Sequence, residues 1–150
     1  MQGRTEIADK FSLSKKYREL YEASGVALNS NDAKLLKSAV KLLMEAHQDK
    51  ADDIKNYHLS HSIEVAIIVA REMELHFNAI ICALLQYVLK DTDIKPGKIE
   101  KLFGPSVRQM LETLTKIARL RTDRISMNAG NFINLLLTIT DDVRIILIRL

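Results

Sequence analysis

The sequence has few of the features that secreted, membrane-spanning or nucleic-acid-binding proteins depend on. Its single cysteine, Cys82, excludes an internal disulfide, and the apolar neighbours of Cys82 favour a small core residue over a reactive thiol. The N-terminus has no apolar signal region, and the longest apolar runs, residues 63–70 and 79–89, are too short to cross a bilayer. No stripe of basic and aromatic residues indicates nucleic-acid binding. These absences predict a cytoplasmic protein that neither spans a membrane nor binds nucleic acid directly.

The composition is that of an ordinary globular domain. The chain has 150 residues, of which 47% are hydrophobic and 27% charged, and its net charge is +3. This length is typical of one domain with a sizeable core, and no internal repeat or low-complexity segment divides the chain. We therefore predict a single domain over residues 1–150.

Apolar residues recur at helical spacing along most of the chain, and no β-hairpin signal interrupts them. This pattern predicts an all-α fold. Ser24-Gly25 is expected to end the first helix, residues 29–32 to cap the second, and Pro105 to begin a later one. Helices are expected at residues 6–23, from the caps to 47, 58–72, 80–92, 98–103, 106–119 and 128–150, with loops at 48–56 and 73–76.

Residues 80–92 organise the predicted fold and read I-I-C-A-L-L-Q-Y-V-L-K-D-T. The first half predicts a buried helix. The second half is expected to stay helical, but Gln86, Tyr87, Lys90 and Asp91 put polar atoms on a segment otherwise suited to a core. Buried polar groups are costly unless paired, so they usually mark a site. His61 opens the preceding apolar helix, and a histidine followed by a polar pair resembles the skeleton of an HD-type metal phosphohydrolase, where the pair is His-Asp.

Five segments follow one another along the chain: H-S-I-E-V-A at 61–66, A-L-L-Q-Y-V-L-K-D-T at 83–92, F-G-P-S-V at 103–107, L-T-K at 114–116 and D-D-V-R-I-I-L-I-R-L at 141–150. In this order they resemble the hydrolase domain of the RelA/SpoT family, which makes and degrades (p)ppGpp. The family patterns are H-P-x-x-V-A, A-L-L-H-D-V-x-E-D-T, F-G-x-x-V, V-T-K-L and D-x-R-V-x-L-I-K-L. The resemblance implies an HD-domain-like bundle of about six to eight helices. It also implies truncation at the C-terminal end, as in the N-terminal fragment of a longer synthetase.

In active members of the family, Mn²⁺ is held by a histidine, a His-Asp pair and a distant aspartate, and activates water against the 3′-diphosphate of (p)ppGpp. Here His61 stands at the first ligand position, Gln86 replaces the second histidine and Tyr87 replaces the aspartate. A neutral amide cannot replace imidazole, and a phenol with a pKa of about 10 supplies no anion at neutral pH. The last aspartate is expected beyond Leu150. We therefore expect three vestigial ligand positions and no metal cofactor.

Lys90 and Asp91 stand where the family has a catalytic Glu-Asp, so one charge is reversed and the other is kept. We expect these positions to be catalytically vestigial. One hypothesis is that the Lys90 ammonium balances charge in place of the ion, because a buried carboxylate without a cation is costly. The alternative is that Lys90 points to solvent at the helix end.

The nucleotide pocket also departs from the family pattern. The family has a basic residue and a G-x-P-Y segment before the first histidine, whereas residues 52–60 read D-D-I-K-N-Y-H-L-S. We expect this acidic loop to repel a guanine nucleotide, although such a ligand is kept open. His58 and His61 lie one helical turn apart and form a weak metal-binding pattern. We prefer an inherited His61, hydrogen-bonded within a vestigial pocket.

Three further side chains are given simple interpretations. His47 and His76 are expected at the surface. Glu64, one turn beyond His61, either orients the ring of His61 or is solvated.

The leading functional interpretation is a catalytically inactive HD domain of a RelA/SpoT-type GTP pyrophosphokinase. Such a parent transfers pyrophosphate from ATP to the 3′-hydroxyl of GTP or GDP in the stringent response. This domain is expected to act structurally or as a regulator, with the downstream synthetase domain of the same chain as its partner. Two alternatives stay open: a working (p)ppGpp 3′-pyrophosphohydrolase with altered ligands, and a helical protein-interaction module. The oligomeric state is left open.

Overall fold

The computed structural model describes residues 14–26, 30–50, 52–72 and 77–120, and all regular structure in these ranges is helical. A helical segment at 14–24 comes first. The helices that follow are α2 (Asn31–Ala46), α3 (Asp52–Glu72), α4 (Phe77–Leu84), α5 (Val88–Asp91), α6 (Pro96–Phe103) and α7 (Pro105–Leu120). The predicted all-α fold is therefore confirmed. The expected helix at 128–150 and the part of the first helix before residue 14 lie outside the described residues.

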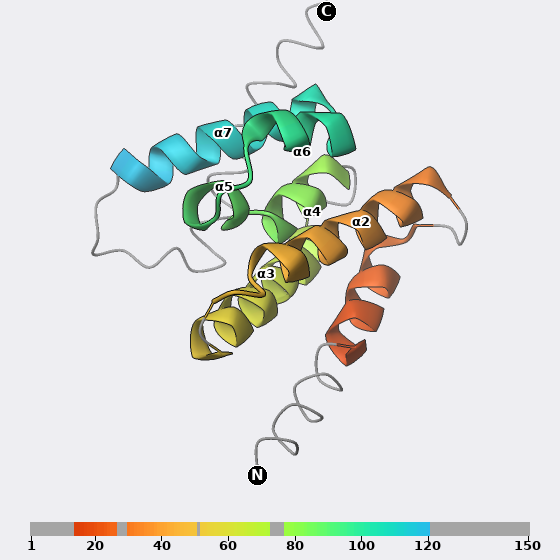
Figure 1. The fold of residues 1–150 in the computed structure, drawn as a ribbon. Helices are drawn as coiled ribbons and strands as arrows, with labels where there is room; N and C mark the ends of the chain where they lie inside the picture. Colours follow the sequence, from red (N-terminus) through yellow and green to blue (C-terminus); the bar gives the residue numbers. More distant parts are fainter. Residues whose placement is uncertain (1–13, 27–29, 51, 73–76, 121–150) are drawn as a thin grey trace, which may run out of the picture.

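Helix α4 is the centre of the core. Every residue from Ala79 to Leu84 is buried, as the apolar run predicts. Helix α4 packs against α2, α3 and α7. Figure 1 shows it between the α6–α7 pair on one side and helices α2 and α3 on the other. Cys82 within it is fully buried, and its thiol lies 3.9 Å from the carbonyl oxygen of Val107 on α7, which confirms the prediction of a core residue.

The predicted helix boundaries near residues 24–32 and 105 are confirmed by the local geometry. Gly25 has a φ of 66°, a left-handed conformation that favours glycine, and it follows the last residue of the 14–24 segment. The hydroxyl of Ser30 accepts a hydrogen bond of 3.1 Å from the backbone N–H of Ala33, so Ser30 caps α2. Pro105 is the first residue of α7.

Two boundaries differ from the sequence prediction. Helix α3 begins at Asp52, so the acidic stretch expected in a loop forms the first turn of a helix. Acidic residues there are favoured by the helix dipole, which explains why a charged run is helical. The helix expected over 80–92 is broken: α4 ends at Leu84 and residues 85–87 form a turn before α5. The Val88 N–H donates to the Leu85 carbonyl at 3.0 Å, a tight turn rather than a continued helix.

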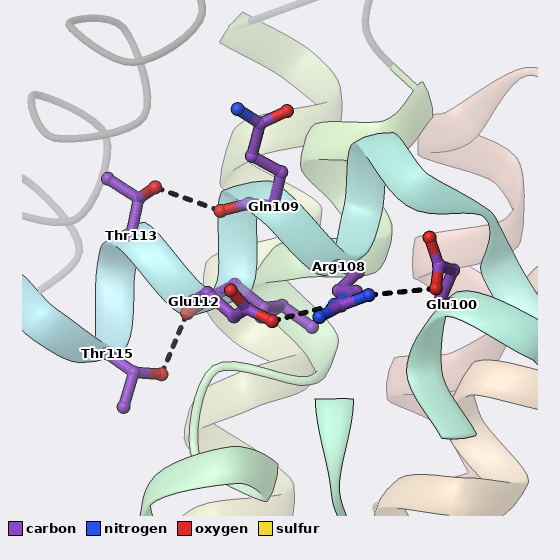
Figure 2. Close-up of polar contacts among 7 residues, drawn as sticks. Glu100, Arg108, Gln109, Glu112, Thr113 and Thr115 are labelled. Carbon is purple, nitrogen blue, oxygen red and sulfur yellow. Dashed lines mark hydrogen bonds and ion pairs between the residues drawn. The ribbon is translucent and has the colours of Figure 1, made fainter. Parts of the chain in front are cut away.

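Helices α6 and α7 form a hairpin around Gly104. The φ of Gly104 is 97°, which a residue with a side chain rarely adopts. Arg108 of α7 lies between two carboxylates, at 2.9 Å from Glu100 of α6 and 2.7 Å from Glu112 of its own helix (Figure 2). These hydrogen bonds, first to Glu112 and then to Glu100, raise the pKa of the Arg108 guanidinium.

The 14–24 segment is fixed to α3 by two ion pairs and by burial. Lys16 lies 2.7 Å from Glu64, and Arg71 lies 2.8 Å from Glu19. Leu20 of the same segment is fully buried in the core. Figure 1 shows the segment beside α2. Within the described part of the chain, no helix is long and apolar enough to cross a membrane.

Candidate functional site

Five aromatic rings gather where the end of α2, the first half of α3 and the 85–87 turn meet. They belong to His47, Tyr57, His58, His61 and Tyr87, and we call them the ring cluster. Three of them come from α3, while His47 follows the last residue of α2 and Tyr87 ends the turn after α4. The packing of α4 against α2 and α3 brings these elements together. The predicted vestigial positions His61 and Tyr87 therefore lie in one site.

Tyr87 stacks on His58. The two ring centroids are 4.2 Å apart and the ring planes differ by only 12°. The ring of His61 is 6.0 Å from Tyr87 and tilted by 46°. Tyr87 thus packs most closely, face to face, against the neighbouring histidine and not against the one at the family's first ligand position.

The amide of Gln86 turns back onto its own backbone. Its Nε2 donates a hydrogen bond of 3.0 Å to the carbonyl oxygen of Ala83. This bond uses the donor side of the amide to satisfy a carbonyl at the end of α4, where the helix leaves such groups without intrahelical partners. Gln86 therefore has a local structural role at the helix break.

His47 is fully buried, so the expectation that it lies at the surface is wrong. Its Nδ1 is 3.0 Å from the carbonyl oxygen of Leu43, and its ring meets that of His58 edge-on at 5.1 Å. Because a carbonyl only accepts, Nδ1 is the donor in this hydrogen bond. Within the described residues, Nε2 of His47 has no hydrogen-bond partner. His76, the other histidine expected at the surface, lies outside the described residues.

His61 is held by packing. The ring of Tyr57, one turn earlier on α3, stacks on it at 5.4 Å with the planes 5° apart. Among the described residues, Nε2 of His61 has no hydrogen-bond partner. Within the described part of the chain no hydrogen bond joins Glu64 to this ring, and the Glu64 carboxylate pairs with Lys16 at 2.7 Å. The expected hydrogen bond of His61 is therefore absent at Nε2 among the described residues.

These residues do not fit a manganese ion. Mn²⁺ prefers carboxylate and water oxygens, supplemented by imidazole. The ring cluster offers imidazoles and phenols, and no group of three or more His, Cys, Asp or Glu in the described ranges is placed to hold a metal ion. The side chains of Lys90 and Asp91 lie outside what the structure describes. Both hypotheses for Lys90 therefore stay predictions.

Sequence reasoning missed two members of the cluster, His47 and Tyr57. The signal for Tyr57 was present, because Tyr57 and His61 are four residues apart on one helix and so face the same side. No local signal marks His47. Its burial depends on how the end of α2 packs against α3, which one helix's pattern does not reveal.

Comparison with known proteins places this geometry in context. A family model described as "HD domain" matches residues 39–150. The chain is 32% identical over 124 residues to the bifunctional (p)ppGpp synthase/hydrolase SpoT of Escherichia coli K12, an alignment that covers 82% of this chain and 18% of that protein. It is 34% identical over 117 residues to the GTP pyrophosphokinase rsh of Brucella melitensis, covering 77% of this chain and 16% of that one. The chain thus spans less than a fifth of the length of these relatives.

Proposed function

This chain belongs to the HD domain family, as an HD domain of the RelA/SpoT type, and from that premise we propose that it is a catalytically inactive member with a structural or regulatory role in (p)ppGpp metabolism. The observation that carries the proposal is the stack of Tyr87 on His58 at 4.2 Å. Tyr87 stands where the family pattern has an aspartate ligand, and its ring contributes packing in place of an anion.

The neighbouring substitution supports the same conclusion. Gln86 stands where the pattern has a histidine, and its amide is hydrogen-bonded to the Ala83 carbonyl. Both replacements give the site contacts that hold α3, α4 and the 85–87 turn together. A hydrolase of this type needs the opposite, namely ligands left available to a cation that activates water. We infer that packing now stabilises the region that a bound metal ion stabilises in active relatives.

We further propose that this domain works in cis with a synthetase region. Two relatives are named a bifunctional synthase/hydrolase and a GTP pyrophosphokinase, and each is far longer than the matched segment. In this proposal the domain restrains the synthetase or relays a signal to it. The intact helical core and the altered ligand positions support a structural or regulatory role for the domain.

A hydrolysis assay tests the loss of activity. The chain, and the full-length protein that contains it, are incubated with Mn²⁺ and (p)ppGpp, with SpoT of Escherichia coli as the positive control. We expect no pyrophosphate release above background. Manganese-dependent release that is abolished by His61→Ala would overturn the proposal in favour of a hydrolase with altered ligands.

A further inference from the structure

An open cavity of about 650 Å³ lies where the 14–24 segment, α2 and α3 meet. None of the described residues that line it belongs to the ring cluster. The apolar part of its wall comes from three elements: Tyr17 of the segment, Val40 and Met44 of α2, and Leu59 and Ile63 of α3. Small-molecule sites in proteins have volumes of about 300–1,000 Å³ and mostly apolar walls. The size and lining of this cavity match that class.

The cavity leaves apolar surface open to solvent. Met44 is 49% exposed, although Leu59 and Ile63 of the same wall are buried in the core. The Tyr17 ring is partly withdrawn from water, and this burial raises the pKa of its hydroxyl. The charge of the neighbouring Tyr21 raises the pKa of Tyr17 further. An apolar hollow with a half-exposed methionine at its edge gains stability when an apolar group covers it.

The rim of the cavity is positively charged. Lys37, Lys41 and Glu45 follow one another at successive turns of α2, and all three line the cavity. In the described part of the chain, the ion pairs engage Lys16, Arg71 and Arg108, and neither Lys37 nor Lys41 takes part in one. Two ammonium groups against one carboxylate leave the rim with a net positive charge. Among the described residues, an anion at the mouth would therefore displace no ion pair of Lys37 or Lys41.

We propose that this cavity binds an amphipathic anion, a small molecule with a long aliphatic body and a single carboxylate. The aliphatic body occupies the wall formed by Val40, Met44, Leu59 and Ile63, and the carboxylate meets Lys37 and Lys41. A polyphosphate does not suit the site, because its charges require many polar partners and the wall is apolar. This proposal is independent of the loss of hydrolase activity.

The cavity and the ring cluster share helix α3, so a ligand in the cavity contacts the helix that carries His61. Leu59 and Ile63 flank His61 on α3, and the segment that supplies Tyr17 is tied to the same helix by the Lys16–Glu64 ion pair. An occupied cavity therefore stabilises the docking of the 14–24 segment on α3. The ligand should raise the melting temperature of the chain as its concentration rises.

Titration calorimetry with dodecanoate tests the proposal, with dodecylamine as the ligand of opposite charge. We expect saturable binding of dodecanoate, weaker binding of dodecylamine, and a loss of about tenfold in dodecanoate affinity for Lys37→Glu/Lys41→Glu. Lys98→Glu/Lys101→Glu on α6 is the matched control, because both lysines are exposed and the net charge changes equally. Its affinity should stay within about twofold of the parent.

A second variant tests the apolar wall without changing the rim. Met44→Gln keeps the length of a half-exposed side chain and should weaken dodecanoate binding while leaving the circular dichroism spectrum unchanged. The proposal is overturned if dodecanoate shows no saturable binding, or if the two charge-reversal variants lose affinity equally. Binding only to vesicles of anionic phospholipid, with no uptake of free dodecanoate, would also overturn it and assign this face to a membrane surface.

Discussion

If packing of Tyr87 has taken over a structural role at this site, then the stack on His58 must contribute measurable stability. The centroids are 4.2 Å apart and the planes differ by 12°, which places the pair among close, near-parallel aromatic contacts. Such pairs contribute about 0.5–1.5 kcal/mol beyond the burial of their area. Tyr87→Leu keeps an apolar side chain but removes the ring. We therefore expect a coupling free energy of about 1 kcal/mol between Tyr87 and His58.

A double-mutant cycle isolates this coupling. The free energy of unfolding in urea is measured for the parent, Tyr87→Leu, His58→Leu and the double variant, and the coupling is the departure from additivity. For a chain of this length, 1 kcal/mol corresponds to about 2–4 °C in melting temperature, so thermal melting gives a second reading. The assay requires a two-state transition, which coincident fluorescence and circular dichroism curves establish.

Tyr57 provides the matched control. It also stacks on a histidine, but its centroid is 5.4 Å from that of His61 and its side chain is 56% exposed. Tyr57→Leu should therefore change the free energy of unfolding by less than about 0.5 kcal/mol. A coupling between Tyr87 and His58 below about 0.3 kcal/mol would refute the structural role of the stack.

Three further predictions concern other parts of the fold. Gly104→Ala should destabilise the chain by about 1–2 kcal/mol, because a φ of 97° is strained for a residue with a side chain even where the Cβ meets no atom within 4 Å. Gly97→Ala is the comparison: Gly97 lies in α6 and also faces open space, so this change should stabilise the chain by up to about 1 kcal/mol. Burial raises the pKa of the Cys82 thiol above its ordinary value of 9.0. The free energy of unfolding should therefore be greatest below pH 9.0 and fall as the pH rises above it, because only the unfolded chain then loses the thiol proton. Cys82→Ala should flatten this decline in urea titrations at several pH values. Arg108→Met should lower the melting temperature by loosening α6 from α7, and the difference from the parent should shrink at high salt.

Much of the fold could be predicted from short stretches of the sequence. The burial of Ala79–Leu84, the cap at Ser30 and the glycine after the first helical segment each depend on a few adjacent residues. The break at residues 85–87 does not, since Leu85 and Val88 continue the apolar pattern and both are buried. Hydrophobic periodicity identifies a buried face but does not report a tight turn within it.

Sequence reasoning singled out three members of the ring cluster, His58, His61 and Tyr87, but not the contacts that they make. The departures at Gln86 and Tyr87 are visible in the sequence because the surrounding pattern fixes what stands there. The partner that each residue takes depends on tertiary packing, which is why the stack on His58 and the burial of His47 became visible only in the structure. Glu64 shows the same limit, because its partner Lys16 lies on a segment distant in sequence.

The most direct test of the central claim is the electron paramagnetic resonance signal of Mn²⁺ titrated with the protein, since free Mn²⁺ gives a signal that is lost when the ion binds. With Tyr87 stacked on His58 and Gln86 bonded to Ala83, we predict that the signal stays that of free Mn²⁺ at equimolar protein, for the parent and for His61→Ala alike. A stoichiometric loss of the signal with the parent, restored by His61→Ala, would contradict the account.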